Sequence, residues 1–178
     1  MRKILRLEFF KQNSDQVARK LIGKYLVRKI GNVCASHMVV EAEAYGGSED
    51  LASHARFGRT KRNKLMWGEA GIFYVYFIYG MHWMLNIVCG KTGDPGAVLI
   101  RGVEGHSGPG RVTKDLNVDG DMNSLKVGTK AGLWFEDRGI VVGNRDVAVK
   151  KRVGVDYAKK WKDKLWNFSL TEKLYQSR

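Results

Sequence analysis

The stretch IFYVYFIY, residues 72–79, indicates the fold class, because all eight of its residues are aromatic or β-branched. These residue types pack well on a pleated surface and favour strands over helices. Gly80 and Met81 predict a bend after the stretch, and residues 83–88 then have the composition of a partner strand. We therefore expect a β-hairpin. Its core-facing side is predicted to carry three residues: Phe73, Val75 and Phe77.

Four further segments have the composition of strands. Residues 25–30 and 33–44 are rich in Val and Ile and meet at Gly31-Asn32, which predicts a second hairpin. Residues 97–102 form another apolar run, and residues 134–149 alternate glycines with β-branched residues, as short strands do. The chain is therefore expected to be built mainly on strands.

Two segments have helical spacing instead. The first is expected to begin at Asn13, which with Gln16 is typical of a capping box, and to end at Gly23. Its apolar residues share one helix face: Val17, Ala18, Leu21 and Ile22. The second is expected to begin at Asp156, a capping residue. Its apolar residues are Ala158, Trp161, Leu165 and Trp166. The glycines of residues 105–111 predict a loop after the strand at residues 97–102.

Length and composition indicate one domain covering residues 1–178. A chain of 178 residues, 44% of them hydrophobic, suits one core. It has no internal repeat, and its two prolines mark no linker. We therefore expect strands and helices to share one core.

The charge balance points to a polyanionic partner. The chain has 31 Lys and Arg against 18 Asp and Glu, a formal net charge of +13. Such a field attracts phosphate groups and makes binding weaken as salt rises. If the basic residues were spread evenly over the surface, the protein would have a positive field but no defined binding site. We expect nucleic acid to be the partner.

The cysteines and the hydropathy pattern favour a reducing compartment. Cys34 and Cys89 lack the spacing of a disulfide framework or a zinc site. No apolar run reaches the length of a membrane-spanning helix, and charges interrupt the first ten residues. We expect a cytoplasmic protein, associated with the nucleoid in a bacterium, or a nuclear one in a eukaryote, with no membrane contact.

The segment VVEAEAY, residues 39–45, carries the first candidate for chemistry. A period of two places Glu41, Glu43 and Tyr45 on one face of a strand. Glutamate is depleted in strands, so two of them suggest a carboxylate in a partly dry cleft that orients a water and takes its proton. On the pattern alone, a solvated strand face is the better explanation of the two glutamates.

Two other regions suggest contacts with nucleic acid. Tyr79 lies at the bend of the aromatic hairpin, where an exposed ring can wedge between bases or stack on them. His54 lies in a stretch with several basic and polar residues, including Arg59 and Arg62, which is typical of phosphate contacts. No other His or Cys has metal-ligand spacing to His54, so we expect no metal.

Several motifs occur in the order found in one enzyme family. They are Glu-Ala-Glu-Ala-Tyr at 41–45, His54, Thr-Lys-Arg-Asn at 60–63, Tyr-Val-Tyr-Phe-Ile-Tyr-Gly-Met at 74–81, Asn86, Arg101, Gly-Pro-Gly-Arg at 108–111 and Arg-Val-Gly-Val at 152–155. In these motifs the chain resembles the alkyladenine (3-methyladenine) DNA glycosylase family, from about residue 7 to residue 166. The resemblance implies a mixed α/β fold of the α+β class, with one domain on a curved, mainly antiparallel β-sheet, flanking helices and a protruding β-hairpin.

The resemblance also implies a function. A family member flips an alkylated or deaminated purine out of double-stranded DNA and hydrolyses its N-glycosidic bond, which leaves an abasic site. The expected substrates are 3-methyladenine, 7-methylguanine, hypoxanthine and ethenoadenine, and the sequence does not rank them. No cofactor is implied, and we expect a monomer of the compact, bacterial kind.

The resemblance assigns the catalytic roles. Glu43 corresponds to the general base and Glu41 to a supporting residue. Arg101 would help to hold the attacking water and a nearby phosphate. A backbone carbonyl of Val153 or Val155 would share that water.

The resemblance also assigns the base and DNA contacts. Tyr45 would stack on one face of the flipped base, His54 and Tyr76 would bound the other, and Asn86 would lie at the pocket wall. Tyr79 would fill the gap left in the duplex. The expected contacts to the DNA backbone are Arg59, Thr60, Arg62, Asn63, Met81 and Arg111.

The residue types agree with this chemistry. A purine alkylated at N3 or N7 is positively charged, so it leaves more readily and is attracted to electron-rich rings. The sugar passes through an oxocarbenium-like state that a carboxylate stabilises. Flipping a base out of the duplex costs a few kcal/mol, and less where the base pair is weakened. Damaged bases therefore enter the pocket more easily than normal ones.

Two other functions were compared with this one. A non-catalytic binder of damaged or single-stranded nucleic acid would use the same basic surface and aromatic residues, but a carboxylate facing phosphates would weaken it. A lyase would need an activated lysine or amine in the pocket, and no predicted pocket position is a lysine. The chain departs from the family at two places that concern DNA contacts: the loop at residues 59–62 is one residue shorter than in mammalian members, and His82-Trp83 replaces other aromatic residues.

Overall fold

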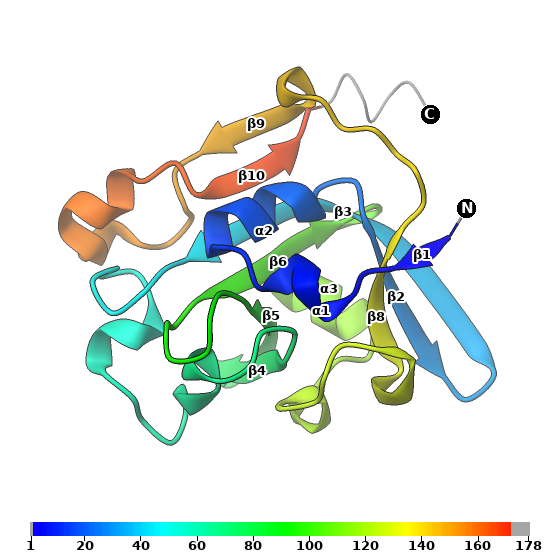
Figure 1. Ribbon diagram of the computed structural model, residues 1–178, viewed down its shortest axis with the longest axis horizontal. Coiled ribbons are helices and arrows are strands. Elements are labelled where there is room, and N and C mark those ends of the chain that lie inside the picture. The colour runs from blue at the N-terminus through cyan, green and yellow to red at the C-terminus, as the bar shows by residue number, and fades with distance from the viewer. Residues whose placement is uncertain (1, 172–178) are drawn as a thin grey trace.

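One curled antiparallel sheet organises the computed structural model, which describes residues 2–171. Among these residues every strand pairing is antiparallel. The main path runs β1 (Lys3–Ile4), β8 (Leu133–Asp137), β2 (Tyr25–Ile30), β3 (Val33–Tyr45), β6 (Ala97–Val103), β5 (His82–Val88) and β4 (Phe73–Ile78). Off this path, β10 (Asn167–Leu170) pairs with β3 and β9 (Val147–Lys150) (Figure 1). Strand β7 (His106–Ser107) pairs with β6. The predicted α+β class and antiparallel sheet are confirmed.

Strand β3 pairs with three other strands of this sheet. Its first half pairs with β2, and its second half pairs with β6 and β10. The register against β6 shifts on both sides of Glu41. Such irregularities increase local twist and bend a strand. The bend in β3 therefore lies at Glu41, the first of its two glutamates.

Short helices connect and cover the strands. The α-helices are α1 (Leu7–Phe10), α2 (Ser14–Leu21) and α3 (Pro109–Asp115). The 3₁₀ helices are η1 (His54–Phe57), η2 (Lys64–Trp67), η3 (Gly120–Met122), η4 (Thr129–Ala131), η5 (Asn144–Asp146) and η6 (Asp156–Asp163). Helix α2 lies across the sheet (Figure 1) and buries Val17, Ala18 and Leu21 completely. These residues pack in the main core with Phe10, Phe73 and Phe135, as the predicted apolar helix face requires.

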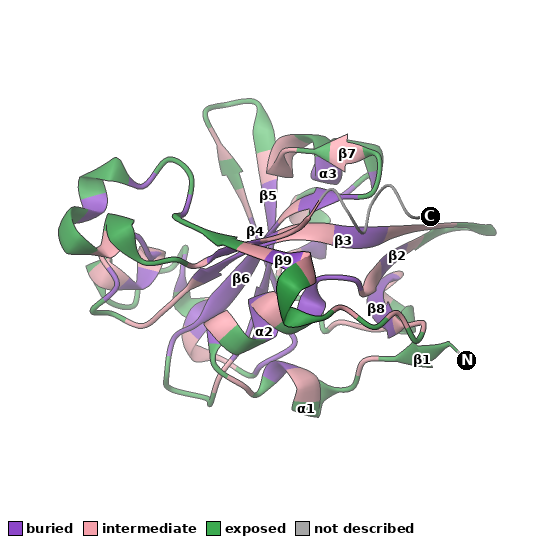
Figure 2. Cartoon of the chain, turned by 90° about the horizontal axis from the view of Figure 1, so that it is seen from above, coloured by how far each residue is buried: buried purple, intermediate pink, exposed green. Residues whose placement is uncertain are grey.

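Both predicted hairpins are present. Their tips, at β2–β3 and β4–β5, are exposed and extend from the body of the molecule (Figure 2). Phe73 and Val75 are buried as predicted, but the prediction that Phe77 is a core residue is wrong, because 43% of its surface is exposed. At that end β4 pairs only with β5, so Phe77 packs on Trp83, with ring centroids 4.8 Å apart, and not on the core.

Three local predictions need correction. Asn13 precedes α2 but its side chain makes no capping hydrogen bond, so no capping box forms. Residues 105–111 are not all loop, because α3 begins at Pro109 directly after Gly108, whose φ of 96° allows the turn. The last helix is the 3₁₀ helix η6, which is kinked at Lys159, and the chain then enters β10. Pairing with β3 and β9 overrides the helical pattern there.

Two further expectations concern the cysteines and the membrane. Cys34 is exposed, Cys89 is buried, and both are free thiols. Within residues 2–171, the structure has no helix of the length and apolarity that a membrane crossing requires.

Candidate active site

A cavity of about 320 Å³ opens beside the second half of β3. This volume lies within the range of roughly 300–1,000 Å³ that is usual for small-molecule sites. Its lining is rich in rings: Tyr45, His54, Tyr74, Tyr76, Tyr79 and Tyr157. Arg101, Asn86 and residues 153–155 also line it. The structure thus brings together residues from β3, β4, β5, β6 and the segments that connect and follow them, which the sequence places far apart.

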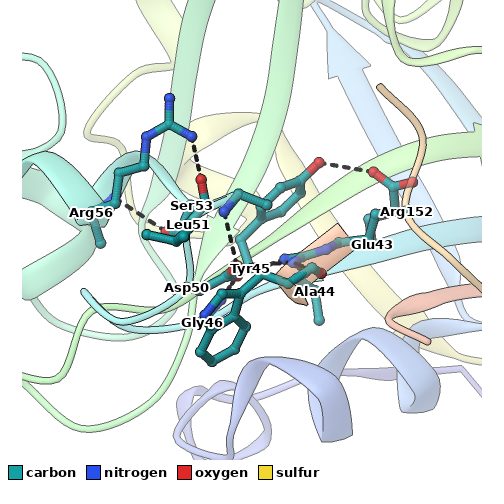
Figure 3. Close-up of polar contacts among 12 residues, drawn as sticks. Glu43, Ala44, Tyr45, Gly46, Asp50, Leu51, Ser53, Arg56 and Arg152 are labelled. Carbon is teal, nitrogen blue, oxygen red and sulfur yellow. Dashed lines mark hydrogen bonds and ion pairs between the residues drawn. The ribbon is translucent and has the colours of Figure 1, made fainter. Parts of the chain in front are cut away.

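Glu43 lies directly behind this wall and has no exposed surface. Its Oε1 accepts hydrogen bonds from the backbone N–H of Val153 at 2.8 Å and from Nδ2 of Asn167 at 2.9 Å. Its Oε2 accepts from the Tyr45 hydroxyl at 2.9 Å (Figure 3) and lies 3.5 Å from Nη1 of Arg101. A buried carboxylate is tolerated only when it is paired and hydrogen-bonded, and these contacts meet that condition.

Glu41 lies on the same face of β3, as the period of two predicts. Its Oε1 is 3.2 Å from Nε of Arg101 and 2.7 Å from Nδ2 of Asn167. Arg101 therefore contacts both glutamates while it also lines the cavity. The alternative of a solvated strand face does not describe Glu43, which the fold encloses completely.

His54, Tyr74 and Tyr76 form one aromatic wall. Nδ1 of His54 is hydrogen-bonded to the Tyr74 hydroxyl at 2.9 Å, and its ring centroid is 4.7 Å from that of Tyr76. Burial, with Arg62 and Arg56 nearby, lowers the pKa of His54 to about 4, so its imidazole is neutral at physiological pH. Burial raises the pKa of Tyr74 to about 12 and that of Tyr76 above its ordinary value. All three rings are therefore uncharged.

Tyr45 forms another part of the cavity lining. Burial and the neighbouring Glu43 carboxylate raise the pKa of its hydroxyl well above the ordinary value, so it stays a hydrogen-bond donor to Glu43. The guanidinium carbon of Arg152 lies 5.0 Å from its ring centroid. Contacts at its hydroxyl and at its ring therefore hold Tyr45 in place at the cavity wall.

Arg152 and Asp50 form a buried ion pair behind Tyr45. Both side chains have no exposed surface, and two N–O contacts of 2.6 and 2.9 Å join them. Arg152 also donates to the carbonyls of Ala44 and Trp161, and Asp50 accepts from the backbone N–H of Gly46 and Ala52 (Figure 3). The pair therefore joins the end of β3 to the loop that carries Val153.

The tip of the β4–β5 hairpin stands beside the cavity. Tyr79 is 81% exposed and has a φ of 55°, in the left-handed region. A non-glycine residue there is uncommon and is held by its surroundings, here by the turn in which Met81 N–H donates to the Ile78 carbonyl. Met81 is 66% exposed. Both side chains are thus largely exposed, and their contacts with DNA stay predictions.

The predicted DNA-backbone residues divide into two groups. Arg59, Thr60, Arg62 and Arg111 are exposed, and Arg62 also donates to the Phe77 carbonyl. Asn63 is only 3% exposed. Its amide bonds the Thr60 backbone and the carbonyls of His54 and Gly58, so it shapes the loop from inside and its side chain does not face the solvent.

The remaining predicted residues lie at the wall of the cavity. Asn86 is buried and its Nδ2 donates to the carbonyls of Tyr74 and Met84. Val153 is exposed and Val155 is buried. The contact between this segment and Glu43 is made by the N–H of Val153, whereas the sequence prediction concerned a carbonyl that holds a water, which stays a prediction.

Two groups at the site had no role in the sequence analysis. Asn167 lies in a segment that resembled the end of a helix, and Asp50 lies in a polar loop after the Glu-Ala-Glu-Ala-Tyr motif. The alternation of Trp166, Phe168 and Leu170 with polar residues is a strand signal that could have placed Asn167 opposite β3. No local signal pairs Asp50 with a residue 102 positions later.

Comparison with known proteins gives a consistent result. The family model described as "Methylpurine-DNA glycosylase (MPG)" matches residues 8–106 and 104–174. A protein of Anaeromyxobacter sp. (strain Fw109-5) is 40% identical, over 96% of this chain and 91% of its own. A protein of Legionella pneumophila (strain Paris) is 39% identical over the full length of both, and one of Clostridium perfringens (strain 13 / Type A) is 31% identical over 96% and 97%. Each is named "Putative 3-methyladenine DNA glycosylase".

The enclosed carboxylate, the aromatic cavity and these matches define a DNA glycosylase, an enzyme that hydrolyses N-glycosyl bonds. The chain belongs to the methylpurine-DNA glycosylase family.

Proposed function

We propose that this enzyme excises alkylated or deaminated purines, among them 3-methyladenine, 7-methylguanine, hypoxanthine and ethenoadenine, from double-stranded DNA. It acts as a monomer on chromosomal DNA, flips the damaged nucleotide into the aromatic cavity and leaves an abasic site. The observation that carries the proposal is the buried Glu43 carboxylate, held by four donors behind a cavity lined with rings. The names of the relatives support the 3-methyladenine part of it.

Glu43 is the general base in this proposal. The oxygen of a water attacks C1′ of the sugar, the N-glycosidic bond breaks, and its electron pair leaves with the base. The water gives one proton to Glu43. The negative carboxylate also stabilises the positive charge that develops on the sugar, and exclusion of solvent strengthens that effect.

The aromatic rings select the base. Tyr45 stacks on one face of it, while His54 and Tyr76 bound the other. The neutral state of all three rings avoids repulsion with a purine that alkylation has made cationic, and the electron-rich tyrosine faces attract such a purine. Asn86 bounds the edge of the base from β5.

Arg101 and the backbone of residues 153–155 hold the water in this proposal. Arg101 lines the cavity and contacts the carboxylate, so it can place a water against Glu43 and reach the phosphate of the flipped nucleotide. The backbone carbonyl of Val153 or Val155 accepts a hydrogen bond from the other O–H of that water.

The direct test is release of free base. The protein is incubated with duplexes that each carry one of the four lesions, and the released base is measured by chromatography against an undamaged duplex. Release from at least one lesion, with an intact abasic strand as the second product, supports the proposal. Tight binding to every lesion without any release would instead indicate a non-catalytic binder.

We expect Tyr79→Ser to impair flipping. In the duplex the Tyr79 ring would replace the stacking lost with the flipped purine, which is worth about a few kcal/mol. The fluorescence of ethenoadenine, which reports unstacking, should therefore fall, and excision should recover in part when the lesion lies opposite a gap or mismatch. Tyr79→Phe is the matched control and should be mild. Unchanged fluorescence and excision for Tyr79→Ser would assign the wedge to another residue, with Met81 the next candidate.

We expect Arg62→Ala and Arg111→Ala to weaken binding to damaged and undamaged duplexes alike. Both residues are exposed, and a phosphate contact carries no base information. Each substitution should lower the slope of log affinity against log salt by about one. Fluorescence anisotropy over a salt series measures that slope. A slope equal to that of the wild type would argue against the contact.

A further inference from the structure

We propose that Asn167 is a positioning residue that orients the Glu43 carboxylate, so that Oε2 and not Oε1 takes the proton of the attacking water. This inference rests on the proposed function of Glu43. The residue lies on β10, directly opposite Glu43 in the antiparallel pair with β3, and only 2% of its surface is exposed.

The contacts of Asn167 divide the carboxylate into two unlike oxygens. Oε1 of Glu43 accepts two N–H groups at short distance, from Asn167 Nδ2 at 2.9 Å and from Val153 N at 2.8 Å. A carboxylate oxygen has two lone pairs, so both positions on Oε1 are occupied. Oε1 is therefore unable to accept a proton from water without losing one of these bonds.

Oε2 has a different environment. It accepts one short bond, from the Tyr45 hydroxyl at 2.9 Å, while Nη1 of Arg101 lies at 3.5 Å, at the limit of hydrogen bonding. Tyr45 and Arg101 both line the cavity. The weakly used lone pair of Oε2 thus lies on the side from which a water approaches.

The amide of Asn167 is suited to this role. Its NH₂ group has two hydrogens, and Nδ2 contacts two acceptors, Glu43 Oε1 and, at 2.7 Å, Glu41 Oε1. The reverse amide orientation would place Oδ1 against two carboxylates and is excluded by repulsion. Because Asn167 is neutral and cannot take a proton, it fixes both glutamates without competing with Glu43 as a base.

The test uses two substitutions of Asn167 and one matched control. Asn167→Leu removes both donors at similar size, and Asn167→Asp keeps the shape while adding a third carboxylate beside Glu41 and Glu43. Ser169→Ala is the control, because Ser169 lies on the same strand opposite Glu41, and its buried hydroxyl makes no hydrogen bond in the described structure. Base release is measured in single turnovers at saturating enzyme over a range of pH.

Both Asn167 variants should release base about 10- to 100-fold more slowly, the scale of a misplaced catalytic group, while lesion affinity stays close to that of the wild type. The acidic limb of the pH–rate profile should move to higher pH, because a lost donor or an added negative charge favours the protonated carboxyl. The other titratable or charged groups facing Glu43 are Glu41 and Tyr45 on β3, Tyr76 on β4 and Arg101 on β6, and all remain in place. Ser169→Ala should leave both rate and profile unchanged.

Three results would overturn the assignment. The first is a wild-type rate of base release in both Asn167 variants. The second is a rate that falls by the same factor at every pH, with the acidic limb of the pH–rate profile unmoved, which indicates a structural role. The third is a wild-type protein that releases no base, or a Glu43→Gln variant that releases base as fast as the wild type. Either result overturns the proposed function and, with it, this role of Asn167. If Asn167→Leu does not fold, as thermal unfolding would reveal, the near-isosteric Asn167→Asp decides alone.

Discussion

Glu43→Gln is expected to reduce base release at least about a hundredfold, the usual scale for loss of a general base, while lesion binding survives. Glutamine keeps the length and shape of the side chain but cannot take a proton from water. Its oxygen can still accept from Val153 and Asn167, so the enclosed position behind the cavity is retained. Its amide would then face Tyr45 and the cationic Arg101, where a negative oxygen lies in the native enzyme.

The measurement is single-turnover release from a duplex that carries 3-methyladenine or ethenoadenine, together with an affinity titration on the same duplex. Glu41→Gln is the matched control, because Glu41 lies on the same strand face and contacts the same Arg101 and Asn167. It should lose much less activity, since Glu41 has a supporting role. Near-normal release by Glu43→Gln, or equal losses in the two variants, would remove Glu43 from the position of base.

Much of this site could be predicted because its residues lie in short, patterned stretches. The alternation in residues 41–45 places Glu43 and Tyr45 on one face, and the 2.9 Å hydrogen bond between them is a direct consequence. The aromatic stretch before Gly80 likewise predicts the hairpin whose turn exposes Tyr79. Local periodicity and turn chemistry are sufficient for such features.

Other parts of the site depend on long-range pairing that no local pattern encodes. Residues 156–166 have helical spacing, yet β10 follows them because Asn167 and Phe168 become buried between β3 and β9. Asn167 then meets Glu43 across 124 residues of sequence. Phe77 illustrates the converse, because the β4–β5 hairpin continues beyond the point where β5 pairs with β6, so alternation no longer implies burial there.

Arg152→Met is expected to lower the free energy of unfolding by about 3–5 kcal/mol, because it leaves Asp50 as an unpaired buried charge. Methionine fills much of the same space but donates no hydrogen bond. Among the described residues, Asp50 would keep the backbone donors Gly46 and Ala52, and the carbonyls of Ala44 and Trp161 would each lose one donor. In a chain of this length such a loss lowers Tm by roughly 6–20 °C.

Urea unfolding measures the free energy, and the neighbouring residue provides the control. Lys151 contacts Asp163 at 2.6 Å, as close as the buried pair, but both partners are more than half exposed. Lys151→Ala should therefore change stability little, since solvent screens an exposed pair. Adding Asp50→Asn to Arg152→Met should restore part of the stability, because it removes the unpaired charge. If Arg152→Met were as stable as Lys151→Ala, burial of the ion pair could not be what joins the end of β3 to the loop that carries Val153.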